Sequence, residues 1–164
     1  MRKTFRIVVG MDGSAQAQRA LDWAMTEATA HAHRGQPATV QVITAWERDT
    51  DIAPAATWPS RDPQATAKDI LALAVTTAGG PPVGVTLTGT AVEGPVATVI
   101  GRVADGADLL VLGSHGYRHQ LHRPVLGAVA EACVRDAICP VVVIPVARTS
   151  STSHAREALA SVAG

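Results

Sequence analysis

Aromatic residues and net charge are both scarce in this sequence of 164 residues. Only 3% of the residues are Phe, Trp or Tyr, and the fourteen basic and fourteen acidic side chains give a formal net charge of zero. A chain without excess positive charge has no general attraction for nucleic acid or for an anionic membrane surface. We therefore expect its partner to be neither a nucleic acid nor a membrane.

Cysteines and long apolar runs are scarce as well. Cys133 and Cys139 form neither a C-x-x-C pair nor a four-ligand zinc pattern. No stretch approaches the roughly 18 apolar residues of a membrane helix. The apolar run near the N-terminus stops at Asp12, which makes it too short for a secretory signal. These absences predict two reduced thiols and a cytoplasmic location.

The composition indicates one compact domain. Hydrophobic residues make up 47% of the chain, enough to build a sizeable core in a single domain of this length. We expect that domain to span residues 1–147. The Ser/Thr-rich segment 148–164 is expected to be a flexible tail.

Apolar runs alternate with segments of helical periodicity along the chain. Continuous apolar runs predict buried strands, whereas apolar residues three and four apart predict helices. The first helix should have Ser14 as its N-cap and end near Gly35, and Pro95 should occupy the first position of the third helix. The expected strands are 5–11, 38–46, 83–92, 108–113 and 139–146, and the expected helices follow the first four at 15–34, 64–78, 95–107 and 124–137.

This alternation predicts an α/β fold. The expected architecture is a five-stranded parallel sheet with helices on both faces, doubly wound and Rossmann-like, in strand order 3-2-1-4-5. In such a sheet the first and fourth strands are neighbours, so the loops "GMDGS" (10–14) and "GSHG" (113–116) should face each other across a crevice. Glycines, successive backbone N–H groups and a following helix N-terminus are features that suit a phosphate group.

From Arg6 to Val146 the sequence resembles the universal stress protein family. The resemblance is carried by "IVVGMDGS", by "VEGPVATVIGRVADGADLLVLGSHG" and by the closing "CPVVVIP". It implies a five-stranded parallel α/β fold, dimerisation and, in one branch, ATP binding through G-x-x-G, nine residues, then G-[S/T]. Gly113 and Gly116 match the first pair of glycines. Ten residues, instead of nine, separate Gly116 from Gly127, and Ala128 stands where the pattern has Ser or Thr.

The resemblance and the loop chemistry together define a candidate nucleotide site. Asp12 is expected against the ribose or the base, although it can also act structurally in the turn before Ser14. The resemblance also implies that the backbone N–H and C=O of Ala45 face the adenine edge. The full candidate set is Asp12, Gly13, Ala45, Gly113, Ser114, His115, Gly116, Arg118, Gly127 and Ala128.

Two further interpretations concern aromatic and metal-binding residues. Trp46 and Trp58 either wall the base pocket or cover the core. His115, His119 and His122 have a spacing that would cluster them on a helix, but they lack a carboxylate or cysteine partner. We therefore expect no dedicated metal site, and we expect Mg²⁺ to be the cation that accompanies bound ATP.

No catalytic constellation is identifiable, so a binding and signalling module in the stress response is favoured over an enzyme. The chain contains neither a G-x-S-x-G elbow nor a G-x-x-x-x-G-K-[S/T] loop. One alternative is a nucleotide-free dimer that acts through protein contacts, and a weaker one is a related α/β enzyme such as an adenylyl transferase. The expected homodimer edge is the last strand, at Val141, Val142, Val143 and Ile144.

Overall fold

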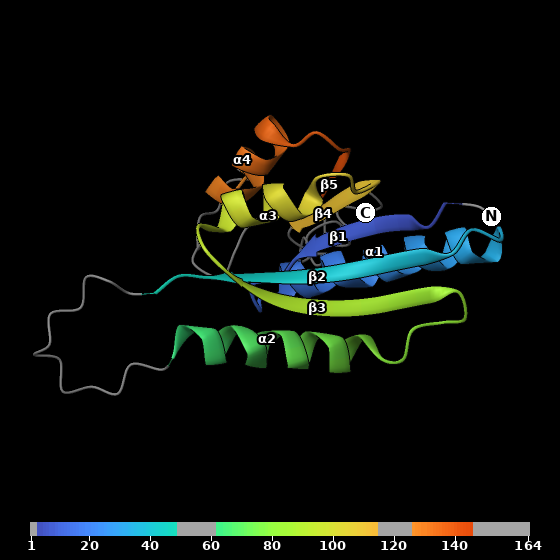
Figure 1. Ribbon diagram of the computed structural model, residues 1–164, viewed down its shortest axis with the longest axis horizontal. Helices are drawn as coiled ribbons and strands as arrows, with labels where there is room; N and C mark the ends of the chain where they lie inside the picture. Colours follow the sequence, from blue (N-terminus) through green and yellow to red (C-terminus); the bar gives the residue numbers. More distant parts are fainter. Residues whose placement is uncertain (1–2, 49–61, 115–125, 146–164) are drawn as a thin grey trace, which may run out of the picture.

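The computed structural model describes residues 3–48, 62–114 and 126–145, and these residues form one α/β unit (Figure 1). Strands and helices alternate along the chain as β1 (Phe5–Gly10), α1 (Ala15–His33), β2 (Ala38–Trp46), α2 (Pro63–Ala78), β3 (Val85–Glu93), α3 (Val96–Ala104), β4 (Leu109–Gly113), α4 (Ala128–Asp136) and β5 (Val141–Ile144). The strands are parallel and lie in the order β3-β2-β1-β4-β5. The predicted fold class and strand order are confirmed.

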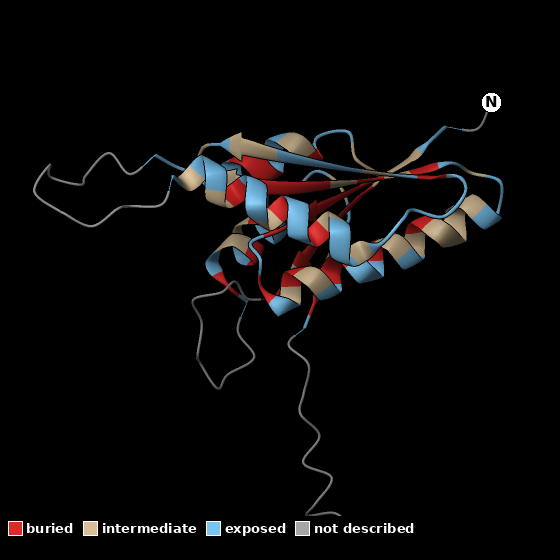
Figure 2. Cartoon of the chain, turned by 90° about the horizontal axis from the view of Figure 1, so that it is seen from below, coloured by how far each residue is buried: buried red, intermediate tan, exposed pale blue. Residues whose placement is uncertain are grey.

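The helices cover both faces of the sheet. Helices α1 and α2 pack on one face around one apolar cluster, and α3 and α4 pack on the other face around a second cluster. Figure 2 shows the buried strands between these helices, whose outer surfaces are exposed. Among the helices of the described residues, none is long and apolar enough to cross a membrane.

Strand β1 occupies the centre because its apolar run serves both faces. Ile7, Val8 and Val9 are fully buried. Ile7 and Val9 belong to the cluster under α1 and α2, whereas Val8 belongs to the cluster under α3 and α4, as the alternation of side chains along a strand requires. Each such burial contributes about 1.5–3 kcal/mol relative to an exposed side chain.

Several predicted boundaries needed correction; among them, α3 ends at Ala104 rather than at residue 107, and β5 spans Val141–Ile144 rather than 139–146. Pro95 is the N-cap of α3, with an extended ψ of 130°, so the helix begins at Val96 and Pro95 does not occupy its first position. Helix α4 begins at Ala128 rather than at residue 124, because the backbone at Gly127 is still extended. Strand β3 begins at Val85 instead of residue 83, whereas β2 has its predicted bounds.

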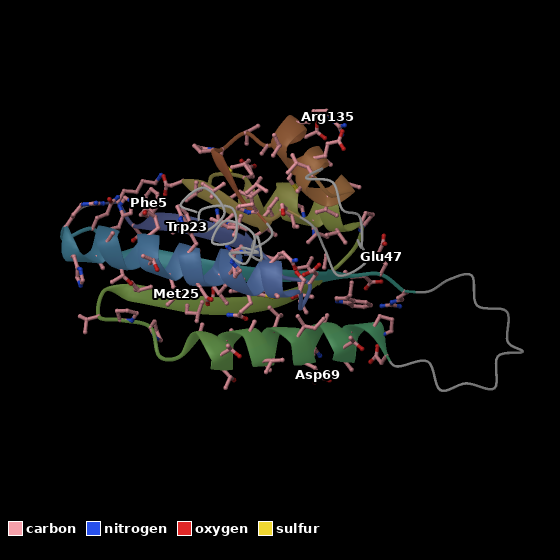
Figure 3. All side chains as sticks on the ribbon, turned by 180° about the vertical axis from the view of Figure 1, so that it is seen from behind. Phe5, Trp23, Met25, Glu47, Asp69 and Arg135 are labelled. Carbon is pink, nitrogen blue, oxygen red and sulfur yellow. The ribbon has the colours of Figure 1, made fainter. Side chains whose placement is uncertain are left out.

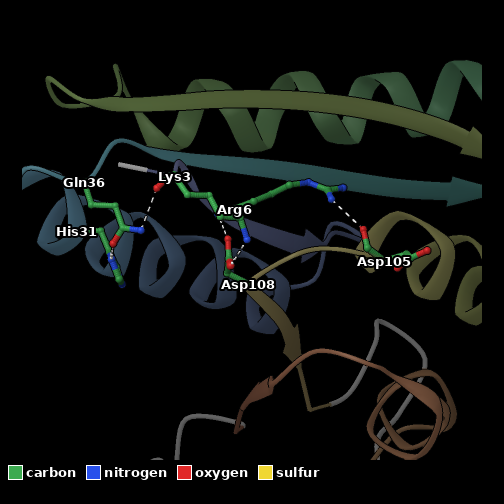
Figure 4. Close-up of polar contacts among 6 residues, drawn as sticks. All are labelled: Lys3, Arg6, His31, Gln36, Asp105 and Asp108. Carbon is green, nitrogen blue, oxygen red and sulfur yellow. Dashed lines mark hydrogen bonds and ion pairs between the residues drawn. The ribbon is translucent and has the colours of Figure 1, made fainter. Parts of the chain in front are cut away.

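Arg6 ties the amino-terminal end of the sheet to the end of α3 (Figure 4). Its guanidinium donates to the carbonyl oxygens of Val103 at 2.6 Å and Asp105 at 3.0 Å, where the helix dipole is negative. Its backbone N–H donates to Asp108 at 2.9 Å, and Lys3 forms an ion pair with the same carboxylate. The Arg6 N–H bond holds the pKa of Asp108 below its ordinary value. This network fixes the start of β4 and stands at the opposite end of the strands from the candidate site.

Both cysteines are free thiols. Cys133 is a buried residue of α4, and burial raises the pKa of its thiol. Cys139 is half-buried, and burial raises the pKa of its thiol as well. Thiols with raised pKa values hold little thiolate at neutral pH, so both cysteines are weak nucleophiles.

Candidate functional site

The loop after β1 forms one wall of the site. The Asp12 carboxylate accepts a hydrogen bond from the Ser14 N–H at 2.9 Å, and the Ser14 hydroxyl accepts from the Ala17 N–H at 3.1 Å. Ser14 is therefore the N-cap of α1, as predicted. Asp12 is exposed at the turn before it, and Gly13 takes a φ of +81°, a backbone conformation that favours glycine.

The end of β4 forms the second wall and connects it to the start of α4. The Ser114 N–H donates to the carbonyl of Ile144 in β5, and the Ser114 carbonyl accepts from the Gly127 N–H, both at 2.8 Å. This second bond holds the N-terminus of α4 against the carboxyl end of β4. Gly127 caps the helix without a side-chain bond, so the first-turn N–H groups beginning at Ala128 point toward this end of the sheet.

Gly113 has a packing role that the loop motif did not reveal. A methyl group built on Gly113 would lie 2.9 Å from Cβ of Gln16, 3.1 Å from its carbonyl carbon and 3.2 Å from the backbone N of Ala17. The absent side chain thus allows the end of β4 to touch the first turn of α1. This contact brings the Asp12 loop and the Gly113 end of β4 to the same edge of the sheet.

Ala45 lies at the same edge, two residues past the point where β1 stops pairing with β2. The Ile43 carbonyl accepts from the Met11 N–H, and the Trp46 carbonyl accepts from the Gly94 N–H on the opposite side of the strand. Because backbone groups alternate sides along a strand, the N–H and C=O of Ala45 are directed to the β1 side. They face the space beyond Gly10, as a base-edge contact would require.

Two features of this edge were not singled out from the sequence, the close packing of Gly10 and the buried hydroxyl of Thr44. Gly10, the last residue of β1, packs tightly against β4, because a methyl group on Gly10 would lie 2.6 Å from Cδ2 of Leu112. The Thr44 hydroxyl is buried and, within the described residues, has no hydrogen-bond partner. A glycine inside an apolar run signals such a close approach, but a threonine in a strand carries no signal of its own.

Several candidates lie outside the described residues. These are His115, Gly116 and Arg118 of the nucleotide set, together with Trp58, His119, His122 and the tail 148–164. The described part of the site comprises Asp12, Gly13, Ala45, Gly113, Ser114, Gly127 and Ala128, all at the carboxyl ends of β1, β2 and β4 or at the start of α4. Trp46, at the end of β2, is half-buried with Arg48 over its ring at 5.9 Å.

Metal ligands do not gather in the part of the chain that the structure describes. No group of three His, Cys, Asp or Glu side chains there could hold an ion. A surface groove of about 460 Å³ lies at the other end of the sheet, between α1 and the turn from α2 to β3, and is lined in part by Met25, His33 and Pro82. Figure 3 shows Met25 and Trp23 on opposite flanks of α1. Because the groove lies at the end of the sheet opposite the carboxyl ends of the strands, it is separate from the candidate site.

A parallel sheet whose strand order reverses beside β1, with helices on both faces, defines a doubly wound α/β protein. Proteins of this class bind ligands at the carboxyl ends of the strands, where the order reverses. The model of the universal stress protein family matches residues 3–145. The chain belongs to the universal stress protein family.

Relatives and solved structures agree with this assignment. A universal stress protein of Mycobacterium tuberculosis (strain H37Rv) is 34% identical over 155 residues, which cover 87% of this chain and 48% of the relative. The chain thus spans about half the length of the curated relatives it matches. The structure of UspA from Lactobacillus plantarum is 26% identical with a TM-score of 0.63, covering 88% of this chain and 99% of that one. A universal stress protein in complex with cAMP is 26% identical with a TM-score of 0.60, covering 85% and 96%.

Proposed function

We propose that this protein binds an adenine nucleotide at the carboxyl edge of its sheet and acts as a binding and signalling module of the stress response. The observation that carries the proposal is the bond from the Gly127 N–H to the Ser114 carbonyl, which sets the N-terminus of α4 beside the end of β4. Opposite it stands the exposed carboxylate of Asp12. A similar solved protein binds cAMP, which supports the same ligand class here.

Each part of the site has a chemical role in this proposal. The N–H and C=O of Ala45 bind the adenine edge, and the Asp12 carboxylate accepts from a ribose hydroxyl. The first-turn N–H groups of α4 and the positive end of its dipole receive phosphate oxygens. The ligand is ATP accompanied by Mg²⁺, and the protein binds it without a dedicated catalytic base.

The proposed ligand is tested by mass spectrometry of nucleotide released from the purified protein, followed by calorimetric titration with ATP, ADP, AMP and cyclic AMP. Asp12→Asn should weaken binding about tenfold, because the ribose hydroxyl would donate to a neutral amide oxygen in place of a charged carboxylate. Asp22→Asn is the matched control, since Asp22 is an exposed carboxylate on α1 whose side chain bonds Gln18. Equal affinities for both variants would place the ligand elsewhere.

Ala128 supplies a gain-of-function test. It is exposed at the first position of α4, where the family's ATP-binding pattern carries a hydroxyl. Ala128→Ser should tighten ATP binding by about tenfold, because a new hydroxyl can donate to a phosphate oxygen. Ala65→Ser, in the exposed first turn of α2, should leave the affinity unchanged. If the serine at 128 has no effect, the phosphates do not lie at this helix.

A nucleotide-free dimer is the second candidate, and we propose that β5 forms a homodimer edge in either case. Val141, Val142 and Val143 are half-buried in the last strand, and Ile144 is buried. The apolar side chains of Val134 in α4 and Ile138 between α4 and β5 are 48% and 79% exposed. Val143→Lys should abolish association through β5, and sedimentation equilibrium should then give a smaller assembly than for the wild type. If the chain releases no nucleotide and shows no heat with millimolar ATP, the dimer alone remains as the function.

A further inference from the structure

The sheet has a second edge, and it is longer than the first. Strand β3 has nine residues, against four for β5, and within the described residues it pairs with β2 alone (Figure 1). Its sequence, "VTLTGTAVE", contains no lysine or proline, and its one charge, Glu93, is paired with Arg48 at 2.8 Å. Natural edge strands usually carry lysine, proline or unpaired charged side chains that prevent pairing with another chain. The β3 edge has no lysine, proline or charged side chain between Val85 and Val92.

The backbone groups that β3 directs outward can be identified. Gly94 donates its N–H to Trp46 of β2, so even-numbered residues of this segment face β2 and odd-numbered residues face away from the sheet. The outward N–H and C=O groups therefore include those of Leu87, Gly89 and Ala91. The same alternation places Thr86, Thr88 and Thr90 together on the face away from α2, and all three are exposed.

We propose that the β3 edge pairs with the β3 edge of a second copy of this chain, antiparallel and about a two-fold axis at Gly89. In this register Gly89 opposes the partner's Gly89, and Leu87 opposes the partner's Ala91. Both are pairs of outward residues that can exchange hydrogen bonds. Thr88 opposes the partner's Thr90 as a pair without backbone bonds, where side chains come closest and threonine hydroxyls can bond each other.

Helix α2 fits this pairing. It packs on both β2 and β3, so its axis lies about half a strand spacing inside the edge. Pairing the two β3 strands about 4.8 Å apart then places the two α2 axes about 10 Å apart, within the usual distance of packed helices. Leu71 and Val75 of α2 lie over Gly89, which puts the exposed, small Ala72 near the two-fold axis. A small side chain at the crossing lets the helices approach.

Charge favours the same occupant. The formal net charge of the chain is zero, so two copies do not repel each other as highly charged chains do. The threonine face brings no like charges together across the axis. The β3 pairing extends the sheet from one molecule into the next and uses none of the residues of the candidate nucleotide site or of β5.

The test exploits the pairing of positions 88 and 90. Thr88→Lys combined with Thr90→Lys places like charges opposite each other twice across the axis, whereas Thr88→Lys combined with Thr90→Glu places opposite charges there. Sedimentation velocity over a range of concentrations, with Val143→Lys present in every chain so that β5 does not contribute, measures self-association through β3. Thermal melting checks the fold of both variants. We expect the dissociation constant to rise about tenfold or more for the Lys/Lys variant and to return to or below the value of the Val143→Lys chain alone for the Lys/Glu variant.

A cross-linking experiment tests the register without depending on β5. Thr88→Cys and Thr90→Cys chains, mixed and mildly oxidised, should give a disulfide-linked pair that neither single variant gives alone. The proposal is overturned if the mixture yields no more cross-linked pair than the single variants, or if the Lys/Lys variant associates as the Val143→Lys chain alone does. Neither readout involves nucleotide. A failure of the proposed β3 pairing therefore leaves the proposed nucleotide site standing, and a failure of the nucleotide site leaves the β3 pairing standing.

Discussion

Gly113→Ala should destabilise this protein more than its place in a glycine loop suggests. The new methyl group would stand 2.9 Å from Cβ of Gln16 and 3.1–3.2 Å from backbone atoms of Gln16 and Ala17. Backbone atoms in the first turn of a capped helix cannot move aside as a flexible side chain can. Overpacking of this kind costs about 1–3 kcal/mol, which for a chain of this length lowers the melting temperature by about 3–10 °C.

Differential scanning calorimetry with Gly101→Ala as control measures this effect. Gly101 is an exposed glycine inside α3, and no neighbouring atom lies within 4 Å of a methyl group built there. Its replacement should raise stability by roughly 0.5–1 kcal/mol, because alanine favours the helix. If Gly113→Ala melts at or above the wild-type temperature, the close contact between β4 and α1 is not a constraint, and the loop role alone explains the glycine.

Three other predictions follow from single contacts. Ser14→Ala removes the bond to the Ala17 N–H and should cost about 1 kcal/mol in urea unfolding; an unchanged midpoint would show that the cap contributes nothing. Asp108→Asn should lower stability at neutral pH, and because the folded pKa of Asp108 is depressed by the Arg6 N–H, the difference from wild type should fade as the pH falls through about 4 and below; a difference that persists in acid would contradict this cause. The buried thiol of Cys133 should react with iodoacetamide at pH 7 far more slowly than after unfolding in urea, and equal rates would show that the α4 packing is open.

The predicted fold rested on patterns that the sequence carries locally. The apolar run at Ile7, Val8 and Val9 is long enough for one strand and apolar on both sides, which only a sheet covered on both faces can use. Ser14 was recognisable as a helix start because its hydroxyl suits the N-cap. The family pattern located Gly113 and Ser114 at the end of β4, and the structure has them there.

Other features depend on groups that are distant in the chain. From the sequence, Gly113 was interpreted as a loop glycine. Its contact with Gln16 exists only because β4 lies beside β1, and Gln16 is in the first turn of α1, the helix that follows β1. The start of α4 at Ala128 is fixed by the bond of Gly127 to Ser114, which no local propensity encodes. The buried hydroxyl of Thr44 likewise follows from the packing around the end of β2.

The sequence by itself determined the alternation of strands and helices, the central position of β1 and the loops at the carboxyl edge, since hydrophobic periodicity and turn residues act over a few neighbours. The tertiary structure alone decided which loops touch, where Gly113 allows close approach and which edge of β3 is exposed. These properties arise when segments about 100 residues apart are brought within van der Waals distance, as Arg6 and Asp108 are across 102 residues of chain. A pattern read along the chain does not contain that distance.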